Sequence, residues 1–414
     1  MRKQLLFLTS RFPFPLNKGA KLRALYQIKE LRRWMDVHLV SISEKQPTPE
    51  EWNAVNTHCK SMHNYVIGKP QRYAQTLTDL LGSRPPSVSY FYRPWVQKKI
   101  DRLLAEIEPD IIHCHLIRMV EYVKNIEHIP RSIDFMDCFS LGAKKELSQS
   151  LPPLRKQIVK MEYRRLGRYE KKCTSLFDHQ FIISATDRSA LPGAKASKVE
   201  ILANGVDRSA FYPGNRTKKF DLLFSGHMGY VPNIAAAKYA ITKIHALLKP
   251  SVSMLVAGIG ITEDIKQLKQ TNLVLQEEFT HIREAFWQSR ILLAPMTISI
   301  GLQNKILQAM AMRMPVVCSP QANKAIQAPV GSAVLVADRP DEYVKAIERL
   351  LMDATFFESI ADAGYQFVTE NFVWEEVNRP LVRALASPLH PNKKNASSGL
   401  GLGQENHKKN TIHE

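Results

Sequence analysis

The sequence predicts an α/β protein in which two doubly wound parallel sheets face each other across a central cleft. Short runs rich in Val, Ile and Leu recur along the chain between segments of helical periodicity, a pattern typical of parallel strands covered on both faces. The chain has 414 residues, 44% of them hydrophobic, and this length exceeds what one core supports. The alternation continues before and after about residue 195, so we infer two sheets and not one very wide sheet.

The expected strands are spread along the whole chain. In order, they are KQLLFLTS, VHLVSIS, DIIHCH, HIPRSIDFMD, DHQFIIS, VEILANG, FDLLFSG, SMLVAGIG, NLVLQ, RILLAPM, MPVVCSP and SAVLVA. Ligands of such sheets bind beyond the carboxyl ends of the strands, so two facing sheets place the site in the cleft between them. The turns that follow the strands are therefore where functional side chains are expected.

The most informative unit lies between Ile291 and Pro320, where a buried strand, a turn at Gly301, a two-faced helix and a second buried strand follow one another. At about 100° per residue, one helix face carries Ile306, Leu307, Met310, Ala311 and Met314. The other face, expected to be open to a ligand, carries Asn304, Lys305, Gln308 and Met312. A helix N-terminus with a lysine in its first turn can hold a diphosphate. A solvated Lys305 in an ordinary αβ unit explains the pattern equally well.

Other strand ends supply further candidates. After the first strand, Gly19 precedes a helix and lets the backbone approach a ligand. His115 ends DIIHCH and would project into the cleft, either as a donor to a sugar or phosphate or as a satisfied end-of-strand residue. In the second half, Gly226 and Gly229 lie in the turn that leads into another helix, which presents backbone N–H groups at the sheet edge.

Two carboxylates, Asp134 and Asp137, lie at the end of another expected strand. Such a group can be a base, a hydroxyl ligand or a helix cap, and the cap is the usual role. Neither GxGxxG nor a P-loop follows the glycine-bearing strand FDLLFSG. A dehydrogenase of the Rossmann type and a kinase are therefore poorly supported.

The formal net charge of +18 suggests nucleic acid, an anionic membrane surface or phosphate-rich small molecules as partners. The densest basic cluster lies in residues 153–173, where eight Lys and Arg residues alternate with an apolar stripe at near-helical spacing. The stripe consists of Leu154, Ile158, Met161, Tyr169 and Cys173. A helix packed by this stripe on its own domain is the first interpretation, and membrane contact is the second. No nucleic-acid-binding motif accompanies the charge, so no nucleic-acid partner is expected.

The sequence is typical of a cytoplasmic protein. Its five cysteines are scattered and odd in number, which indicates reduced thiols in place of disulfides or a zinc site. Arg11 interrupts the N-terminal apolar run well before signal-peptide length, and no run approaches the roughly 18 apolar residues of a membrane span. The tail from Ser387 is rich in Gly, Ser, Asn and Lys and is expected to be disordered.

Three segments together resemble the retaining nucleotide-sugar glycosyltransferases of family 4. They are VEILANGVDRSAFYP (199–213), SGHMGYVPN (225–233) and GLQNKILQAMAMRMPVV (301–317). Their order and spacing match that family's Asn-Gly-Val-Asp…Phe-x-Pro loop and its Lys-x-Leu-Glu-Ala-Met-Ala helix followed by Pro-Val-Val. RFPFPLNKGAKLR and FMDCFS resemble a bacterial branch, so the likeness covers roughly residues 5–385.

The resemblance implies a GT-B fold of two Rossmann-like domains. Residues 1–195 would form the acceptor-side domain, 196–372 the nucleotide-sugar domain, 373–386 a helix that crosses back, and 387–414 the tail. The implied activity is transfer of a sugar from a nucleotide-sugar donor to a glycan or lipid-linked acceptor in surface polysaccharide or glycoconjugate synthesis. Such an enzyme would work at the inner face of the plasma membrane, with the donor as a substrate and no cofactor.

The resemblance also implies roles for individual residues. Lys305, as a catalytic residue, would stabilise the leaving diphosphate together with the helix N-terminus and without a metal. His115, also catalytic, would reach the transferred sugar or its phosphate, and Gln308 would hold the ribose. The implied donor-binding residues are Gly19, Gly226, Gly229, Gly301, Asn304 and Gln308. The chain has no Asp-x-Asp motif, which agrees with metal independence.

Three departures from the family pattern leave a second interpretation open. Gln308 replaces the ribose-binding glutamate, Ala20 follows Gly19 where the family has aspartate, and Ser299 and Ile300 occupy the region of an upstream glutamate. Loss of the charge-assisted hydrogen bond costs about 1 kcal/mol, or about fivefold to tenfold in donor affinity. The alternative is a weakened or non-catalytic relative that acts as a binding or assembly partner. A sugar-nucleotide epimerase shares the fold, but the quoted motifs favour transfer.

Overall fold

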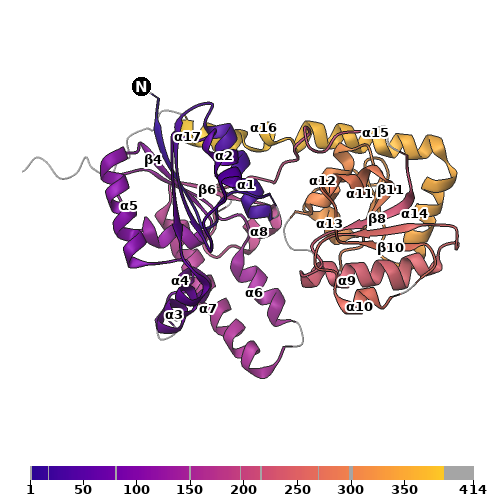
Figure 1. Cartoon of the computed structure of the whole chain (residues 1–414), viewed down its shortest axis with the longest axis horizontal. Helices are drawn as coiled ribbons and strands as arrows, with labels where there is room; N and C mark the ends of the chain where they lie inside the picture. The colour runs from indigo at the N-terminus through magenta and orange to yellow at the C-terminus, as the bar shows by residue number, and fades with distance from the viewer. Residues whose placement is uncertain are drawn as a thin grey trace, which may run out of the picture.

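The structure is a computed structural model. It describes residues 2–16, 18–79, 82–148, 151–195, 197–214, 217–268, 270–297 and 302–386. The chain forms two α/β lobes side by side, the first drawn in indigo to magenta and the second in pink to yellow (Figure 1). Each lobe has a parallel sheet covered by helices, as the sequence predicts. Gly301 and the tail from residue 387 lie outside the described residues.

In the described part of the first lobe, seven strands form a parallel sheet in the order β3-β2-β1-β4-β5-β6-β7. They are β1 (Gln4–Thr9), β2 (Asp36–Ser43), β3 (Ser61–Val66), β4 (Ile111–His115), β5 (Arg131–Asp134), β6 (His179–Ile182) and β7 (Val199–Ile201). The register pairs Thr9 with His115 and His115 with Asp134. The last residues of three neighbouring strands therefore lie in one row at the carboxyl edge of the sheet.

Helices connect these strands and cover the sheet. They are α1 (Gly19–Leu31), α2 (Pro49–Asn56), α3 (Lys69–Thr78), α4 (Pro86–Ser89), α5 (Pro94–Ile107), η2 (Ile117–Tyr122), α6 (Phe139–Leu147), α7 (Pro153–Leu176) and α8 (Ala185–Ala190). Proline stands in the first turn of α2, α4, α5 and α7, where its fixed φ suits the helix and its missing N–H costs nothing.

In the described part of the second lobe, six strands form a parallel sheet in the order β10-β9-β8-β11-β12-β13. They are β8 (Phe220–Ser225), β9 (Met254–Ala257), β10 (Leu273–Gln276), β11 (Ser289–Ala294), β12 (Val316–Cys318) and β13 (Leu335–Val336). Its helices are α9 (Val231–Tyr239), η3 (Ala240–Ile244), η4 (His245–Leu247), α10 (Glu263–Lys266), α11 (Arg283–Trp287), α12 (Asn304–Ala311), α13 (Pro320–Lys324), α14 (Pro340–Met352) and α15 (Ala354–Asn371). The core residues of β8, β9 and β11 are fully buried, and each large apolar side chain contributes about 1.5–3 kcal/mol.

The chain crosses between the lobes later than the sequence suggested. Residues 199–201, expected in the second domain, pair with β6 and complete the first sheet as β7. The linker to the second lobe therefore begins after Ile201. It contains the Asn-Gly-Val-Asp motif of residues 204–207.

The C-terminal helices return to the first lobe, as predicted (Figure 1). The expected single helix over 373–386 is two helices, α16 (Trp374–Val377) and α17 (Arg379–Ala386). The break lies at Asn378, and Pro380 in the first turn of α17 has no N–H to donate back to α16. Leu381 and Leu385 are fully buried in a cluster with β1 and α1.

Candidate active-site cleft

A buried ion pair occupies the carboxyl edge of the first sheet. Asp134, at the end of β5, binds Arg23 of α1 through two hydrogen bonds of 2.5 and 3.0 Å, and both side chains are fully buried. Gln27, one turn further along α1, donates to the same carboxylate at 2.6 Å. Burial raises the pKa of Asp134, but the charge and hydrogen bonds of Arg23 and the nearby histidines lower it to about 2. The helix cap usual for such a carboxylate is therefore replaced here by an ion pair.

Arg23 also connects the first domain to the linker and, through it, to the second domain. Its Nη1 donates to the Ala203 carbonyl at 3.0 Å and to Asn204 Oδ1 at 3.1 Å. Asn204 Nδ2 in turn donates to Asn304 Oδ1, at the first residue of α12, at 3.2 Å. A continuous polar chain thus runs from β5 to the N-terminus of α12.

The rest of the Asn-Gly-Val-Asp motif fixes the domain junction. A Cβ on Gly205 would lie 2.9 Å from the Trp374 Cα, so only glycine fits against α16. Asp207 accepts a hydrogen bond from the hydroxyl of Tyr26, whose ring stacks on Trp374 with centroids 4.7 Å apart. A cavity of about 560 Å³ adjoins this junction, but none of the predicted site residues lines it. The motif therefore acts as a connection between the domains, and Asn204 is the member that reaches α12.

Lys305 is buried in the first turn of α12. Its Nζ donates to Asn233 Oδ1 at 3.0 Å and lies 4.7 Å from the ring centre of Phe224, and no carboxylate pairs with it among the described residues. Burial lowers the pKa of Lys305 to about 7. The prediction of an open helix face is wrong for Lys305 and Met312, whose side chains are only 8% and 7% exposed. Long helical side chains point back toward the N-terminus, which directs Lys305 under α9 and not into solvent.

The turn after β8 is shaped to bring Asn233 to Lys305. A Cβ on Gly226 would lie 2.8 Å from Asn233 Nδ2, which itself donates to the His227 carbonyl at 3.0 Å. Gly229 donates its backbone N–H to His227 Nδ1 at 3.0 Å. A larger residue at position 226 would collide with Asn233, which explains the glycine. The turn is adjacent to Lys305 through Asn233.

Gly19 and Asn304 face each other across the two domains. A Cβ on Gly19 would lie 3.9 Å from Asn304 Nδ2 and 3.5 Å from Met136 Cε. The N-terminus of α1 in the first domain thus meets the N-terminus of α12 in the second. Gln308 lies one turn further along α12 and is half-buried.

His115 is fully buried and does not project into an open cleft. Its ring packs against Phe7, with centroids 6.2 Å apart, and neither ring nitrogen has a hydrogen-bond partner in the described part of the chain. Burial lowers the pKa of His115 to about 4, so the ring is neutral at pH 7. Burial raises the pKa of nearby Asp137 to about 7, and Asp187 adds to the effect.

Sequence reasoning missed Arg23, Asn204 and Asn233 as parts of the site. The signal for Arg23 is weak but present, because Arg23 and Gln27 lie one turn apart on the face of α1 that also buries Ala24 and Ile28. Two polar residues on a core-facing stripe indicate a buried polar network. For Asn233, the predicted helix opening was visible, but its contact with Lys305 spans 72 residues of sequence.

Comparisons with known proteins agree with this architecture. Residues 219–353 match the family described as Glycosyl transferases group 1, and a sequence search of curated proteins found no match. Sucrose-phosphate synthase from Thermosynechococcus elongatus is 12% identical with a TM-score of 0.67, covering 92% of this chain and 98% of that one. HepE from Anabaena, in complex with UDP and glucose, is 13% identical with a TM-score of 0.68, covering 94% and 100%.

A third solved structure, a glycosyltransferase from Rickettsia africae, is 12% identical with a TM-score of 0.63 and covers 92% of this chain and 97% of its own. The TM-scores establish a shared fold, while the family match comes from the segment that contains α12. The chain therefore has the GT-B fold, and its residues 219–353 match the family model of the group 1 glycosyl transferases.

Proposed function

We propose that the protein transfers a sugar from a nucleotide-sugar donor to a glycan or lipid-linked acceptor, with retention at the anomeric carbon. The observation that carries the proposal is Lys305, a buried ammonium without a carboxylate partner in the described chain, at the N-terminus of α12. The family match includes this helix. HepE, which shares the fold, was solved with UDP-glucose.

Departure of a nucleoside diphosphate develops negative charge, which Lys305 and the α12 N-terminus are placed to stabilise. The helix contributes a partial positive charge and unpaired N–H groups, and an arriving phosphate would hold Lys305 in its protonated form. These groups supply the charge stabilisation that a metal ion supplies elsewhere, so we propose a metal-independent reaction. Asn233 would keep the ammonium oriented in the absence of donor.

The proposal gives roles to the remaining predicted residues. In the proposal Gln308 binds the ribose, and Gly226, Gly229, Asn304 and the turn at Gly301 approach the diphosphate. Gly19 brings the first domain against the donor. In the proposal neutral His115, whose ring nitrogens have no partner among the described residues, reaches the sugar through an intervening water.

Release of nucleoside diphosphate from a panel of nucleotide sugars, with and without added acceptor, tests the function. Acceptor-stimulated release from one donor is the expected result. An epimerase would convert the sugar while it stays attached to the nucleotide. Binding of a donor without release would favour the non-catalytic alternative, which Gln308, Ala20, Ser299 and Ile300 motivate.

Restoring the family's glutamate at residue 308 is expected to tighten nucleotide binding about fivefold to tenfold, because a carboxylate accepts a stronger hydrogen bond from ribose than an amide does. Calorimetric titration of UDP and GDP into the parent and Gln308→Glu measures the difference. Equal or weaker binding by the variant would mean that the ribose lies elsewhere or that the pocket is adapted to the amide.

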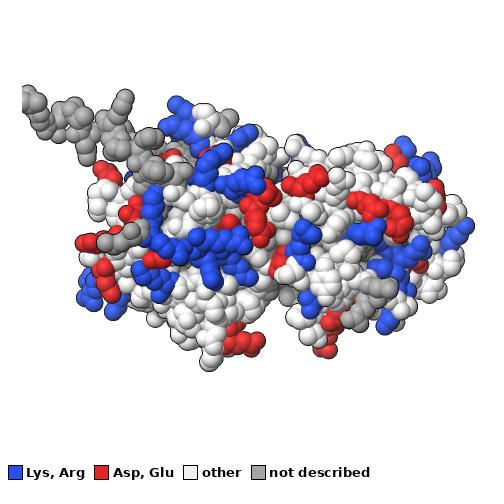
Figure 2. Space-filling view, turned by 90° about the horizontal axis from the view of Figure 1, so that it is seen from above, with Lys and Arg blue, Asp and Glu red and all other residues white. Residues whose placement is uncertain are grey.

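The structure changes the interpretation of the basic helix α7. Leu154 and Ile158, expected to pack on the domain, are 76% and 49% exposed. The buried residues of α7 are Val159, Leu166, Glu170 and Cys173, so of the expected stripe only Cys173 is fully buried. No helix in the described chain is long and apolar enough to cross a membrane. Basic side chains also form a band across the first lobe seen from above, so the charge is not confined to α7 (Figure 2).

We therefore propose reversible association of α7 with an anionic membrane at the cytoplasmic face. Each basic residue near such a surface contributes about 1 kcal/mol, and the two exposed apolar side chains add burial in the interface. Vesicles containing anionic lipid are expected to sediment the parent at low salt and release it at high salt. Leu154→Ser combined with Ile158→Ser should weaken the association without changing net charge. Equal sedimentation by this variant would assign any membrane contact to another face.

A further inference from the structure

A cavity of about 470 Å³ lies in the first domain at the carboxyl ends of β1, β2 and β4. We call it the basic cavity. Its cationic lining residues are Arg11, Lys18, Lys21, Arg72 and Arg118. The lining contains one carboxylate, that of Glu44. Five cations against one anion in a concave site is the charge pattern of an anion-binding site.

Two guanidinium groups of the lining retain unused hydrogen-bond donors. Arg72 Nη2 and Arg118 Nε are buried and have no partner in the described structure. Both guanidinium groups lie 5.0 Å from the ring centre of Phe91, and Arg118 also lies 4.9 Å from that of Phe139. The rings pack against the guanidinium groups, both arginines line the basic cavity, and their unpaired N–H groups gain a partner if an oxyanion binds there.

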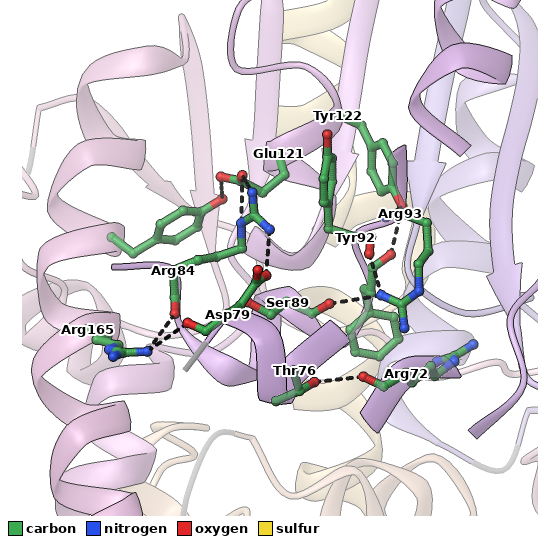
Figure 3. A network of polar contacts seen from close by, with 12 residues as sticks. Arg72, Thr76, Asp79, Arg84, Ser89, Tyr92, Arg93, Glu121, Tyr122 and Arg165 are labelled. Atoms are coloured by element: carbon green, nitrogen blue, oxygen red, sulfur yellow. Dashed lines mark hydrogen bonds and ion pairs between the residues drawn. The ribbon is translucent and has the colours of Figure 1, made fainter. Parts of the chain in front are cut away.

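Two other arginines of the same domain, Arg84 and Arg93, have partners within the protein for their guanidinium groups. Arg84 forms ion pairs with Asp79 and Glu121, both at 2.8 Å or less, and Arg93 donates to the Ser89 carbonyl (Figure 3). Arg93 also donates to the Gln71 carbonyl. Those arginines are satisfied by the protein. Arg72 lies close to this network in the same view, and its Nη2 has no hydrogen-bond partner among the described residues.

The cations of the basic cavity also repel one another. Burial and Arg11 lower the pKa of Arg118 to about 10, and Arg11 is the main cause of the lowered pKa of Lys18. Glu44 opposes the shift at Arg11, while Asp137 and Glu162 oppose it at Arg118. Holding these like charges together costs stability that a bound anion would return.

The basic cavity adjoins the donor cleft. Lys18 directly precedes Gly19, whose Cβ position lies 3.9 Å from Asn304 at the start of α12. A molecule bound in the cavity is therefore next to the proposed site of transfer. Resting on the function proposed above, we propose that the basic cavity binds a phosphate or diphosphate group of the acceptor.

The group could belong to a soluble sugar phosphate or to the headgroup of a polyprenyl diphosphate lipid, because both present the same oxyanions. Calorimetric titration with inorganic pyrophosphate, glucose 6-phosphate and farnesyl diphosphate separates them. Pyrophosphate tests the charge alone, and the other two probes add a sugar or an isoprenoid chain. Tighter binding of one organic probe than of the other identifies the source.

The decisive variant combines Arg11→Gln with Lys18→Gln, which changes one half-buried and one exposed side chain of the lining. It should bind pyrophosphate about tenfold or more weakly than the parent, because two charged donors are lost. Glu44→Gln removes the opposing charge and should bind about threefold more tightly. Lys45→Gln, the matched control on an exposed neighbour outside the lining, should bind within about twofold of the parent, since exposed charges are screened.

Lys305→Met separates this proposal from the donor site. Pyrophosphate binding that survives in Lys305→Met and is lost in the Arg11 and Lys18 variant supports the basic cavity. Three results would overturn the proposal for the basic cavity. They are loss of pyrophosphate binding in Lys305→Met alone, unchanged binding in the Arg11 and Lys18 variant, and no binding by the parent. If the parent binds pyrophosphate in the cavity but never binds a nucleoside diphosphate or releases one, the proposed function fails while the anion site remains.

Discussion

Lys305→Met is expected to lower turnover strongly and at the same time to stabilise the protein. The parent buries an ammonium whose pKa falls from 10.5 to about 7 because of desolvation alone. At pH 7 and below this burial costs on the order of a few kcal/mol, which a methionine of similar length would not incur. Removal of the ammonium leaves the departing diphosphate without its charge partner, so turnover should fall about 100-fold or more.

The stability effect has a defined pH window. Between pH 7 and 10.5 the unfolded state binds more protons than the folded state, so the parent gains stability as the pH rises. The advantage of Lys305→Met should therefore be largest at pH 6 and almost gone at pH 10.5. Urea unfolding at both pH values measures it, with Lys243→Met as the control for an exposed lysine of the same domain. A variant that is less stable than the parent at pH 6, or that keeps its turnover, would contradict the role of Lys305.

Asp134→Asn is expected to have the largest destabilising effect, about 3–5 kcal/mol in the free energy of unfolding, because it leaves the Arg23 charge buried without a partner. Replacing Arg23 with methionine in the same chain should recover part of the loss. Asp36→Asn is the matched control, since its ion pairs with Lys60 and Arg2 are largely exposed and contribute about 0–1 kcal/mol.

The ion pair also predicts an acid transition. The pKa of Asp134 is about 2 in the folded protein against an ordinary value of 3.8, so its contribution is present above pH 3.8 and lost as the pH falls toward 2. Urea unfolding between pH 5 and 2 should show this loss in the parent and a smaller one in Asp134→Asn. Equal pH dependence in the two proteins would mean that another carboxylate dominates.

The architecture could be predicted because parallel strands that are buried on both faces consist of continuous apolar residues in the sequence. The expected runs correspond to strands of the two sheets, and the missed strand β3 shows the limit. Ser61–Val66 is an edge strand that is half-buried along most of its length and carries His63 and Asn64, so no apolar run marks it. An edge strand needs burial on fewer sides and therefore leaves a weaker signal.

Only those site residues could be predicted that lie in turns next to the strand ends, because such turns are visible in the local sequence. Gly19 and Asn304 meet across the cleft, as turns at facing sheet edges should. The depth of Lys305 and His115 could not be foreseen, because periodicity assigns a residue to a face without saying what covers that face. The Arg23–Asp134 pair joins residues 111 positions apart. Its only signal in the sequence is that Arg23 and Gln27 lie on the buried face of α1.

Titration of UDP and GDP into the parent and Lys305→Met at pH 7 and pH 9 is the most direct measurement of whether α12 holds the donor diphosphate. One nucleotide should bind the parent, and its affinity should fall by up to about tenfold per pH unit above 7 because the bound anion requires protonated Lys305. Lys305→Met should bind it much more weakly at pH 7, with no such pH dependence. Equal binding by the two proteins, or no nucleotide binding by the parent, would contradict the assignment of this site.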